Sequence, residues 1–355
     1  MRIAILWSCL SGYLNACLKE LASRDGVQLF VCDQPLAPPQ APFDDSQFAW
    51  IPDRFRFRSA DDAEGLTARV RAFDPEIVVF SSWNVPAYRR ITRMLAKKTF
   101  RVMAIDNCWR ATPKQRMGTL IAPWFVQPLA DAIWLPGEPQ AAFAKRLGFE
   151  QRNILRGVYS CDQPTIEQVH VSRVNAGRPV PRAFLFVGRF VECKGLDQLA
   201  KAYELYRNRV RDPWPLICCG SGPLESELRG RRGIHLEGFI QPDRLSEKLA
   251  SAGCFILPST LENWSIALHE AASAGLLILA SENVGATAHL VQSNYNGYIF
   301  KSHDIESMSA LMSHISNLNE ERLDAMSRAS HLLSKQFTPA RWADTILESR
   351  SLTLT

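Results

Sequence analysis

The sequence predicts two doubly wound α/β domains in tandem, and three observations support this prediction. Its 355 residues exceed what one ordinary core holds and suit two domains. Short apolar runs alternate with helical patterns along almost the whole chain, which is typical of parallel sheets built from βαβ units. A polar, proline-containing and aperiodic stretch at 162–182 interrupts this alternation and indicates an interdomain linker.

The first half contains five runs with the length and apolar character of strands. They are Ile3–Trp7, Val27–Cys32, Ile77–Ser81, Arg101–Ile105 and Ala132–Leu135. Between the first two, residues 13–22 form an amphipathic helical pattern with Leu14, Cys17, Leu18 and Leu21 on one face. We therefore expect an N-terminal domain over 1–165, followed by a linker over 166–182.

The same alternation restarts after the linker and predicts a second domain over 183–337. Its strands are Ala183–Val187, Leu216–Cys219, Ile234–Leu236, Cys254–Leu257, Leu276–Ala280 and Tyr298–Phe300, with closing helices near 304–318, 320–335 and 339–350. Ligands of doubly wound sheets bind at the carboxyl ends of the strands. We therefore expect the two domains to face each other across a cleft that holds the site.

Composition excludes several classes of protein. No apolar run approaches the roughly 18 residues of a spanning helix, and the start of the chain is typical of a strand rather than a signal segment, so we expect a cytoplasmic protein. The nine cysteines include no Cys-x-x-Cys pair, so neither a disulfide framework nor a zinc site is indicated. The net charge of +5 comes from dispersed basic residues, so we expect no nucleic-acid partner.

One basic stretch leaves two interpretations open. Arg89, Arg90, Arg93, Lys97 and Lys98 surround apolar residues at helical spacing. This pattern fits a solvated helix face, and it also fits a helix in peripheral contact with a membrane.

Loops after consecutive strands of the second domain carry the candidate ligand-binding residues. Gly188 and Arg189 end the first strand, and Lys194 follows five residues later, so two cations precede a helix, as a diphosphate would require. A solvated loop with basic residues is the alternative. Gly220 and Gly222 follow the next strand, where glycine lets the backbone approach a ligand closely.

The most informative motif is Glu262-Asn263-Trp264-Ser265-Ile266-Ala267-Leu268-His269-Glu270, in which seven residues separate the two acids. If a helix begins near Ser265, Glu262 lies in the preceding loop and Glu270 on the second turn. Two carboxylates in these positions could accept hydrogen bonds from hydroxyls on two sugar rings of one ligand. The backbone amides of Asn263–Ile266 could donate hydrogen bonds to phosphate or sugar oxygens. The alternative is one loop acid and one exposed helical acid.

Over 183–335 these motifs, in this order, resemble the retaining two-domain GT-B glycosyltransferases of family 4. The resemblance implies the GT-B fold, with two Rossmann-like domains and the last helix, 338–355, returning to the first. It also implies that Arg189 and Lys194 hold a donor diphosphate, that Glu270 binds ribose hydroxyls, and that Glu262 meets the transferred sugar. The remaining donor-binding residues implied are Gly12, Gly188, Gly220, Gly222, Phe239, Ile240, Asn263, Trp264, Ser265 and Ile266, with Phe239 and Ile240 beside the base.

The first domain departs from the family pattern. The family often has a Gly-Gly pair in the first loop, and this chain has Ser11-Gly12. The family usually places a histidine near the donor sugar, but the first histidine here is His170, and Asp106 occupies the equivalent place. Asp106 either shields a positive sugar carbon in the transition state or is a turn residue. Ser265 stands where many members carry glycine.

The resemblance thus implies a retaining, metal-independent hexosyltransferase that uses a nucleotide-sugar as co-substrate and no cofactor. No Asp-x-Asp metal motif is found. The acceptor is a glycan, a lipid-linked or a small molecule, plausible partners in cell-surface polysaccharide synthesis, and we expect it to contact the aromatic loops 33–57 and 107–127. Whether the rings of these loops meet the acceptor or are buried anchors stays open. The alternatives are a nucleotide-sugar-binding protein without turnover and a nucleotide-sugar epimerase of the same fold.

Overall fold

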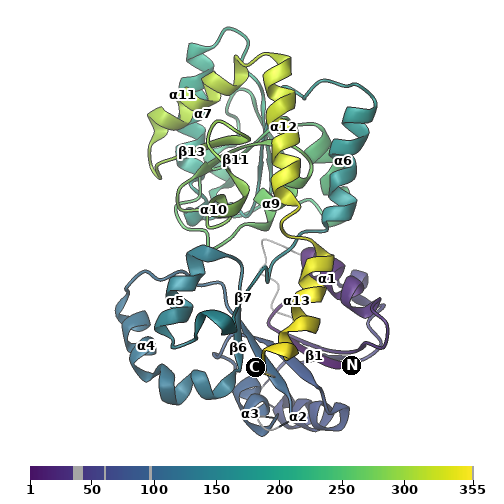
Figure 1. Cartoon of the computed structure of the whole chain (residues 1–355). Helices are drawn as coiled ribbons and strands as arrows, with labels where there is room; N and C mark the ends of the chain where they lie inside the picture. The colour runs from purple at the N-terminus through teal and green to yellow at the C-terminus, as the bar shows by residue number, and fades with distance from the viewer. Residues whose placement is uncertain (35–42, 60, 96–97, 354–355) are drawn as a thin grey trace. The chain divides into compact units, whose positions relative to one another are not determined.

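The computed structural model describes residues 1–34, 43–59, 61–95 and 98–353 (Figure 1). The chain divides into two compact units. Unit 1 contains the described residues of 1–37, 44–161 and 337–355, and unit 2 is formed mainly by residues 162–336. Each unit contains one parallel sheet with helices on its faces, so the prediction of two Rossmann-like α/β domains is confirmed.

The sheet of unit 1 has seven parallel strands in the order β3-β2-β1-β4-β5-β6-β7. They are β1 (Arg2–Trp7), β2 (Gln28–Asp33), β3 (Arg54–Arg56), β4 (Ile77–Ser81), β5 (Phe100–Ala104), β6 (Ala132–Leu135) and β7 (Ile154–Arg156). The inner strands are continuous apolar runs because helices bury both faces of a parallel sheet. Ile3, Ala4, Ile5 and Leu6 of β1, for example, are completely buried.

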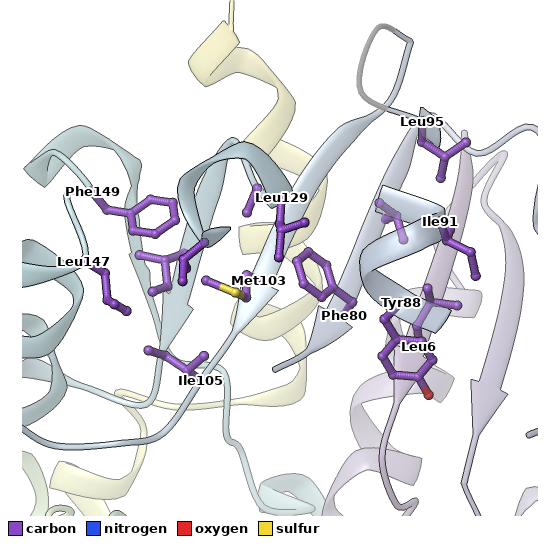
Figure 2. Packing of buried hydrophobic residues seen from close by; sticks show 14 of the residues in the cluster. Leu6, Phe80, Tyr88, Ile91, Leu95, Met103, Ile105, Leu129, Leu147 and Phe149 are labelled. Atoms are coloured by element: carbon purple, nitrogen blue, oxygen red, sulfur yellow. The ribbon is translucent and has the colours of Figure 1, made fainter. Parts of the chain in front are cut away.

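One face of this sheet packs against α2 (Asp62–Phe73), α3 (Pro86–Leu95) and α5 (Ala141–Arg146). Figure 2 shows Tyr88, Ile91 and Leu95 of α3 in this cluster, together with Leu6 and Phe80 of the strands. The apolar side of α3 is therefore used in the core, while Arg90, Arg93 and Lys98 are exposed. This arrangement is that of a solvated surface helix; Lys97 lies outside the described residues.

The other face packs against α1 (Gly12–Ala22) and α13 (Pro339–Ser349), which lie side by side (Figure 1). The ring of Trp342 in α13 lies 5.1 Å from that of Trp134 in β6, and its Nε1 donates to the Val158 carbonyl at 2.9 Å. The end of the chain thus completes the core of unit 1. The remaining helix of this unit, α4 (Pro113–Phe125), precedes β6.

The sheet of unit 2 has six parallel strands in the order β10-β9-β8-β11-β12-β13. They are β8 (Phe184–Val187), β9 (Leu216–Cys219), β10 (Ile234–Gly238), β11 (Cys254–Leu257), β12 (Leu277–Ser281) and β13 (Gly297–Phe300). Its helices are α6 (Gln163–Asn175), α7 (Leu196–Arg209), α8 (Pro242–Ala250), α9 (Ile266–Ser273), α10 (Thr287–Leu290), α11 (Ile305–Ser316) and α12 (Glu320–Ser334).

The expected linker at 166–182 is wrong over most of its length, because α6 occupies residues 163–175 and packs against α8, α9 and α12. Its contacts are largely polar: the His170 ring stacks on that of His331 at 4.5 Å, and Arg173 pairs with Asp324 at 2.9 Å. A helix held in this way has no marked apolar stripe, so hydrophobic periodicity did not reveal it.

The sequence also did not indicate β3 and β7, which are three-residue strands at the two edges of the unit 1 sheet. Edge strands are often short and charged, because such features discourage pairing with other chains. Arg54 of β3, for example, pairs with Asp33 at 2.8 Å. Among the described residues, no helix is long and apolar enough to cross a membrane.

Candidate functional site

The carboxyl ends of the unit 2 strands carry most of the predicted site residues. Arg189 follows β8, Gly220 follows β9, Phe239 follows β10, and Glu262 lies in the loop after β11. These strands are neighbours in the order β10-β9-β8-β11, and every pair is parallel. The loops therefore lie along one edge of the sheet, where doubly wound proteins bind ligands.

Lys194 and Glu262, 68 positions apart, form a direct ion pair between Nζ and Oε2. The side chains are only 11% and 19% exposed. The Ser259 hydroxyl also donates to Glu262 Oε2, at 3.4 Å. Lys194 is the cation predicted to bind the diphosphate, and Glu262 is the carboxylate predicted to accept hydrogen bonds from the sugar. The two side chains thus belong to one partly buried polar cluster.

Backbone contacts fix the loops that carry this pair. Thr260 N–H donates to the Cys193 carbonyl at 2.9 Å. Gly195 has a φ of +66°, and a Cβ there would lie 2.5 Å from the Pro258 carbonyl oxygen. A residue larger than glycine would push the two loops apart. The position of Lys194 relative to Glu262 is therefore set by the fold rather than by the ion pair alone.

Arg189 has a different environment from Lys194. Its side chain is exposed, and no hydrogen bond or ion pair of its guanidinium is found within the described part of the chain. An exposed, unpaired guanidinium beside a paired ammonium gives this edge a cation that an anionic ligand can engage without breaking an existing contact.

The two glycines after β9 have a structural role that the sequence analysis did not include. Gly220 and Gly222 have φ values of 150° and 153°. A Cβ on Gly220 would collide with the carbonyl oxygen of Gly188. A Cβ on Gly222 would lie 2.5 Å from the carbonyl oxygen of Phe190. These glycines allow the two neighbouring loops to pack against each other, which fixes the backbone on which Arg189 stands.

Helix α9 begins as the sequence predicted, directly after Ser265. The Ser265 hydroxyl accepts from Leu268 N–H at 3.2 Å and caps the helix. The φ of Ser265 is 102°, in a region that L-residues rarely adopt and that glycine adopts readily. The first N–H groups of a helix lack intrahelical partners and attract negative charge.

The side chain of Trp264 does not lie at a ligand surface. It is only 2% exposed, and its ring lies 5.8 Å from that of His289. The Trp264 carbonyl accepts from Ala286 N–H at 3.1 Å, and the Glu262 carbonyl accepts from Gly285 N–H at 3.0 Å. The ring therefore anchors the loop before α9, and only the backbone of this residue remains a candidate for ligand contact.

Glu270 lies on the second turn of α9 and shares a partly exposed face with Ile266 and Ala267. Burial raises the pKa of its carboxyl from 4.5 to about 7, and the negative charge of Asp162 adds to this increase. The neighbouring His269 is fully buried and its pKa is lowered to about 4, so it stays neutral and supplies no compensating charge.

Replacing Glu270 by glutamine is therefore expected to stabilise unit 2 at high pH. The pKa of a glutamate is 4.5 in the unfolded chain, whereas that of Glu270 in the folded protein is about 7. Ionisation of this group therefore lowers the free energy of unfolding, and the loss grows between pH 4.5 and 7 and is complete above 7. We expect Glu270→Gln to raise the free energy of unfolding by about 1–2 kcal/mol at pH 8 and to leave it unchanged near pH 4.5, measured by calorimetric unfolding. Glu282→Gln, at an exposed position, is the control; equal effects of the two variants at pH 8 would contradict this account.

Asp106 follows β5 at the carboxyl edge of the unit 1 sheet and is held by a tyrosine. The Tyr159 hydroxyl donates to Asp106 Oδ2 at 3.3 Å, and the Tyr159 ring packs edge-on against Tyr13 at 5.4 Å. Burial raises the pKa of both tyrosines well above 10, so both hydroxyls keep their protons. The sequence interpretation did not include either tyrosine.

The other predicted residues are placed as follows. Gly12 is the first residue of α1, at the carboxyl end of β1 in unit 1. Phe239 and Ile240 follow β10 and are half-buried, next to Gly238, whose carbonyl accepts from Gly220 N–H at 2.7 Å. Within the described ranges, no group of three or more His, Cys, Asp or Glu side chains could hold a metal ion.

Residues 172–331 match the family model described as Glycosyl transferases group 1. An uncharacterized glycosyltransferase of Haemophilus influenzae is 27% identical over 161 residues, which is 44% of this chain and 45% of that protein. O-antigen chain mannosyltransferase C of Escherichia coli is 27% identical over 187 residues, 47% and 48% of the two chains. The match thus spans less than half of these curated relatives.

Solved structures are similar over nearly the whole chain. The crystal structure of Anabaena Alr3699/HepE in complex with UDP and glucose has a TM-score of 0.71 at 14% identity and covers 99% of both chains. A glycosyltransferase from Rickettsia africae has a TM-score of 0.73 at 12% identity, covering 99% of this chain and 98% of that one. At this level of identity the likeness shows the fold, which is the GT-B fold.

Proposed function

Since residues 172–331 carry a glycosyl transferases group 1 domain, we propose that the chain transfers a sugar from a nucleotide-sugar to an acceptor. The observation that carries this proposal is the convergence of Arg189, the Lys194–Glu262 pair and the start of α9 at one edge of the unit 2 sheet. Two cations and a helix N-terminus suit the diphosphate of such a donor.

In the proposed reaction, the bond between the anomeric carbon and the diphosphate oxygen breaks, and a bond to an acceptor hydroxyl oxygen forms. The hydroxyl proton leaves with the nucleoside diphosphate. Arg189 and Lys194 stabilise the negative charge that develops on the leaving group, because their charges are already in place before the bond breaks. Glu262 keeps Lys194 oriented and offers its second oxygen to a sugar hydroxyl.

Glu270 binds the ribose hydroxyls in this proposal. Its carboxyl lies on the partly exposed face of α9, four residues after Ile266. A ribose with two adjacent hydroxyls can donate to both carboxylate oxygens, and these charge-assisted bonds favour the ionised form of the group. Donor binding would then lower the raised pKa of Glu270.

The proposal includes no resident metal or cofactor. Its support is the chemistry of the residues themselves, because two cationic side chains and the first N–H groups of α9 supply the positive potential that a diphosphate needs. Retention of configuration and transfer of a hexose belong to the same proposal and derive from the resemblance to family 4.

We further propose that the acceptor is a glycan or a lipid-linked glycan of cell-surface polysaccharide synthesis, and that the reaction is cytoplasmic. The support is the similarity to O-antigen chain mannosyltransferases B and C of Escherichia coli, 28% and 27% identical over 134 and 187 residues.

The test is a thermal-shift panel of UDP, GDP, ADP and their sugar conjugates, with and without EDTA. We expect one nucleotide to raise the unfolding midpoint, EDTA to leave the increase unchanged, and Glu270→Ala to abolish it. No increase with any nucleotide would contradict the proposed donor site. A bound donor that is neither hydrolysed nor transferred to any glycan acceptor would instead favour a binding protein without turnover.

A further inference from the structure

Helix α4 presents an apolar stripe to solvent rather than to the core. Met117, Leu120, Ile121 and Trp124 are 65%, 73%, 42% and 76% exposed. Their spacing of three, four and seven residues places them on one face of the helix. Among the residues of α4, Ala122 is the buried one.

This exposure contrasts with the other helices of the same sheet. In α3 the equivalent stripe, with Tyr88, Ile91 and Leu95, is buried in the core (Figure 2). A surface helix normally buries the side that carries its large apolar residues. An apolar stripe that faces water is therefore unfavourable in free energy unless another surface covers it. Contiguous exposed apolar surface of this kind marks a docking face.

The surroundings of the stripe are basic. Residues 107–130 include Arg110, Lys114 and Arg116 and no aspartate or glutamate. Lys114 and Arg116 are exposed on the first turn of the helix. The docking face is thus apolar along its length and positively charged at its start.

An open, shallow pocket borders this face. It is lined by Trp109, Arg116, Thr119, Leu120 and Arg146. The Arg146 guanidinium lies over the Trp109 ring, 4.7 Å from its centre. Two guanidinium groups at the mouth of a pocket that adjoins apolar side chains match a phosphate group attached to acyl chains.

We propose that α4 is a membrane-docking helix that lies in the interfacial plane of a bilayer containing anionic phospholipid. Met117, Leu120, Ile121 and Trp124 insert into the boundary between headgroups and acyl chains, while Arg116 and Arg146 contact lipid phosphates. Trp124 suits this depth because tryptophan prefers the membrane interface. A helix of 13 residues is about 20 Å long, so it lies on the membrane and does not span it.

A second copy of this chain is a less suitable occupant. A two-fold contact through α4 would turn two copies of this basic segment toward each other, with no acid in 107–130 to compensate Lys114 and Arg116. An anionic lipid surface compensates these charges directly. The inference goes beyond the proposed transfer reaction, and lipid binding is measurable without donor or acceptor.

The experiment is sedimentation of the full chain with vesicles of phosphatidylcholine alone or mixed with phosphatidylglycerol. We expect the wild-type chain to sediment with the mixed vesicles and more weakly with the neutral ones. Leu120→Ser with Trp124→Ser should lower the vesicle partition coefficient at least about tenfold, because two large apolar groups lose their burial. Arg116→Gln with Arg146→Gln should remove the preference for anionic vesicles.

Leu332→Ser is the matched control, since Leu332 is 59% exposed on α12 in the other unit. It should bind vesicles as the wild type does. Absence of wild-type binding to either vesicle, or an equal loss in Leu332→Ser, would overturn the proposal. Sedimentation velocity without vesicles gives the third outcome: a wild-type dimer that Leu120→Ser with Trp124→Ser converts to monomer, with vesicle binding unchanged, would assign the face to a second copy.

Discussion

Replacement of Asp106 by asparagine is expected to lower turnover by about 100- to 1,000-fold, or roughly 3–4 kcal/mol in activation free energy. If Asp106 meets the donor sugar, as its place in the resemblance to family 4 implies, its carboxylate stabilises the positive charge that develops on the sugar carbon as the diphosphate leaves. Asparagine keeps the size of the side chain and removes the charge. The measurement is the rate of nucleoside diphosphate release from the donor that the thermal-shift panel identifies.

Tyr159→Phe tests how Asp106 is positioned. The Tyr159 hydroxyl donates to Asp106 Oδ2 at 3.3 Å, so its removal leaves the carboxylate charged but less constrained. We expect a fall in kcat of about tenfold with little change in KM, the scale of one hydrogen bond. Tyr295→Phe, at an exposed tyrosine of unit 2, is the control and should change nothing.

Nucleotide binding separates the two interpretations of Asp106. Asp106→Asn should bind nucleoside diphosphate as tightly as the wild type, because the proposed diphosphate contacts are made by unit 2 residues. Full turnover in this variant would mean that Asp106 is only a turn residue. Lost nucleotide binding would mean that it contacts the leaving group rather than the sugar.

Replacement of Lys194 by alanine is expected to weaken nucleoside diphosphate binding by about 2 kcal/mol, or roughly 30-fold, the scale of charge-assisted bonds. It should also lower the stability of unit 2 by about 1–3 kcal/mol. The second effect arises because Glu262, only 19% exposed, loses its ionic partner and keeps its charge. Isothermal titration and calorimetric unfolding measure the two effects separately.

Arg189→Ala is the matched variant for this experiment. It removes the same charge from the same edge of the sheet, but the exposed Arg189 has no ion pair among the described side chains. We therefore expect a similar loss of affinity without a loss of stability. Arg182→Ala controls for net charge, since Arg182 is exposed and precedes β8 at the opposite edge. Unchanged affinity in both Lys194→Ala and Arg189→Ala would refute the site.

The buried strands of both sheets could be predicted because parallel sheets require continuous apolar runs, as in Ile77–Ser81 and Cys254–Leu257. Elements that are short or are held by polar contacts could not be predicted in this way. The edge strands β3 and β7 are only three residues long, and α6 is stabilised by the stacking of His170 on His331 and by the Arg173–Asp324 pair. Such contacts join distant residues and leave no periodic signal.

The same limit applies to the candidate site. Residues at strand ends, such as Arg189 and Glu262, could be proposed from their position alone. Sequence position did not predict the pairing of Lys194 with Glu262 or the burial of the Trp264 ring, because both depend on how separate loops pack. Tyr159 follows β7, which the sequence did not indicate, so no strand end pointed to it.

Helical periodicity likewise did not show which helix of unit 1 exposes its apolar side. The pattern at 89–98 fitted both a solvated helix face and membrane contact, and the structure places its buried apolar residues Ile91 and Leu95 in the core. The segment 107–127 was expected to be an aromatic loop, but residues 113–125 form helix α4, and the apolar stripe of this helix is exposed. Periodicity shows that a helix has an apolar side, but only the tertiary structure shows what that side meets.

The place of α13 has a consequence for synthesis of the protein on the ribosome. Unit 1 begins at the N-terminus but needs Trp342, Ala343 and Ile346 to cover one face of its sheet. All of unit 2 is made before these residues emerge. Unit 2 can therefore fold first, while the unfinished face of unit 1 stays available to chaperones or to other nascent chains. A chain released before α13 is made would have all of unit 2 but would leave one apolar face of the unit 1 sheet uncovered.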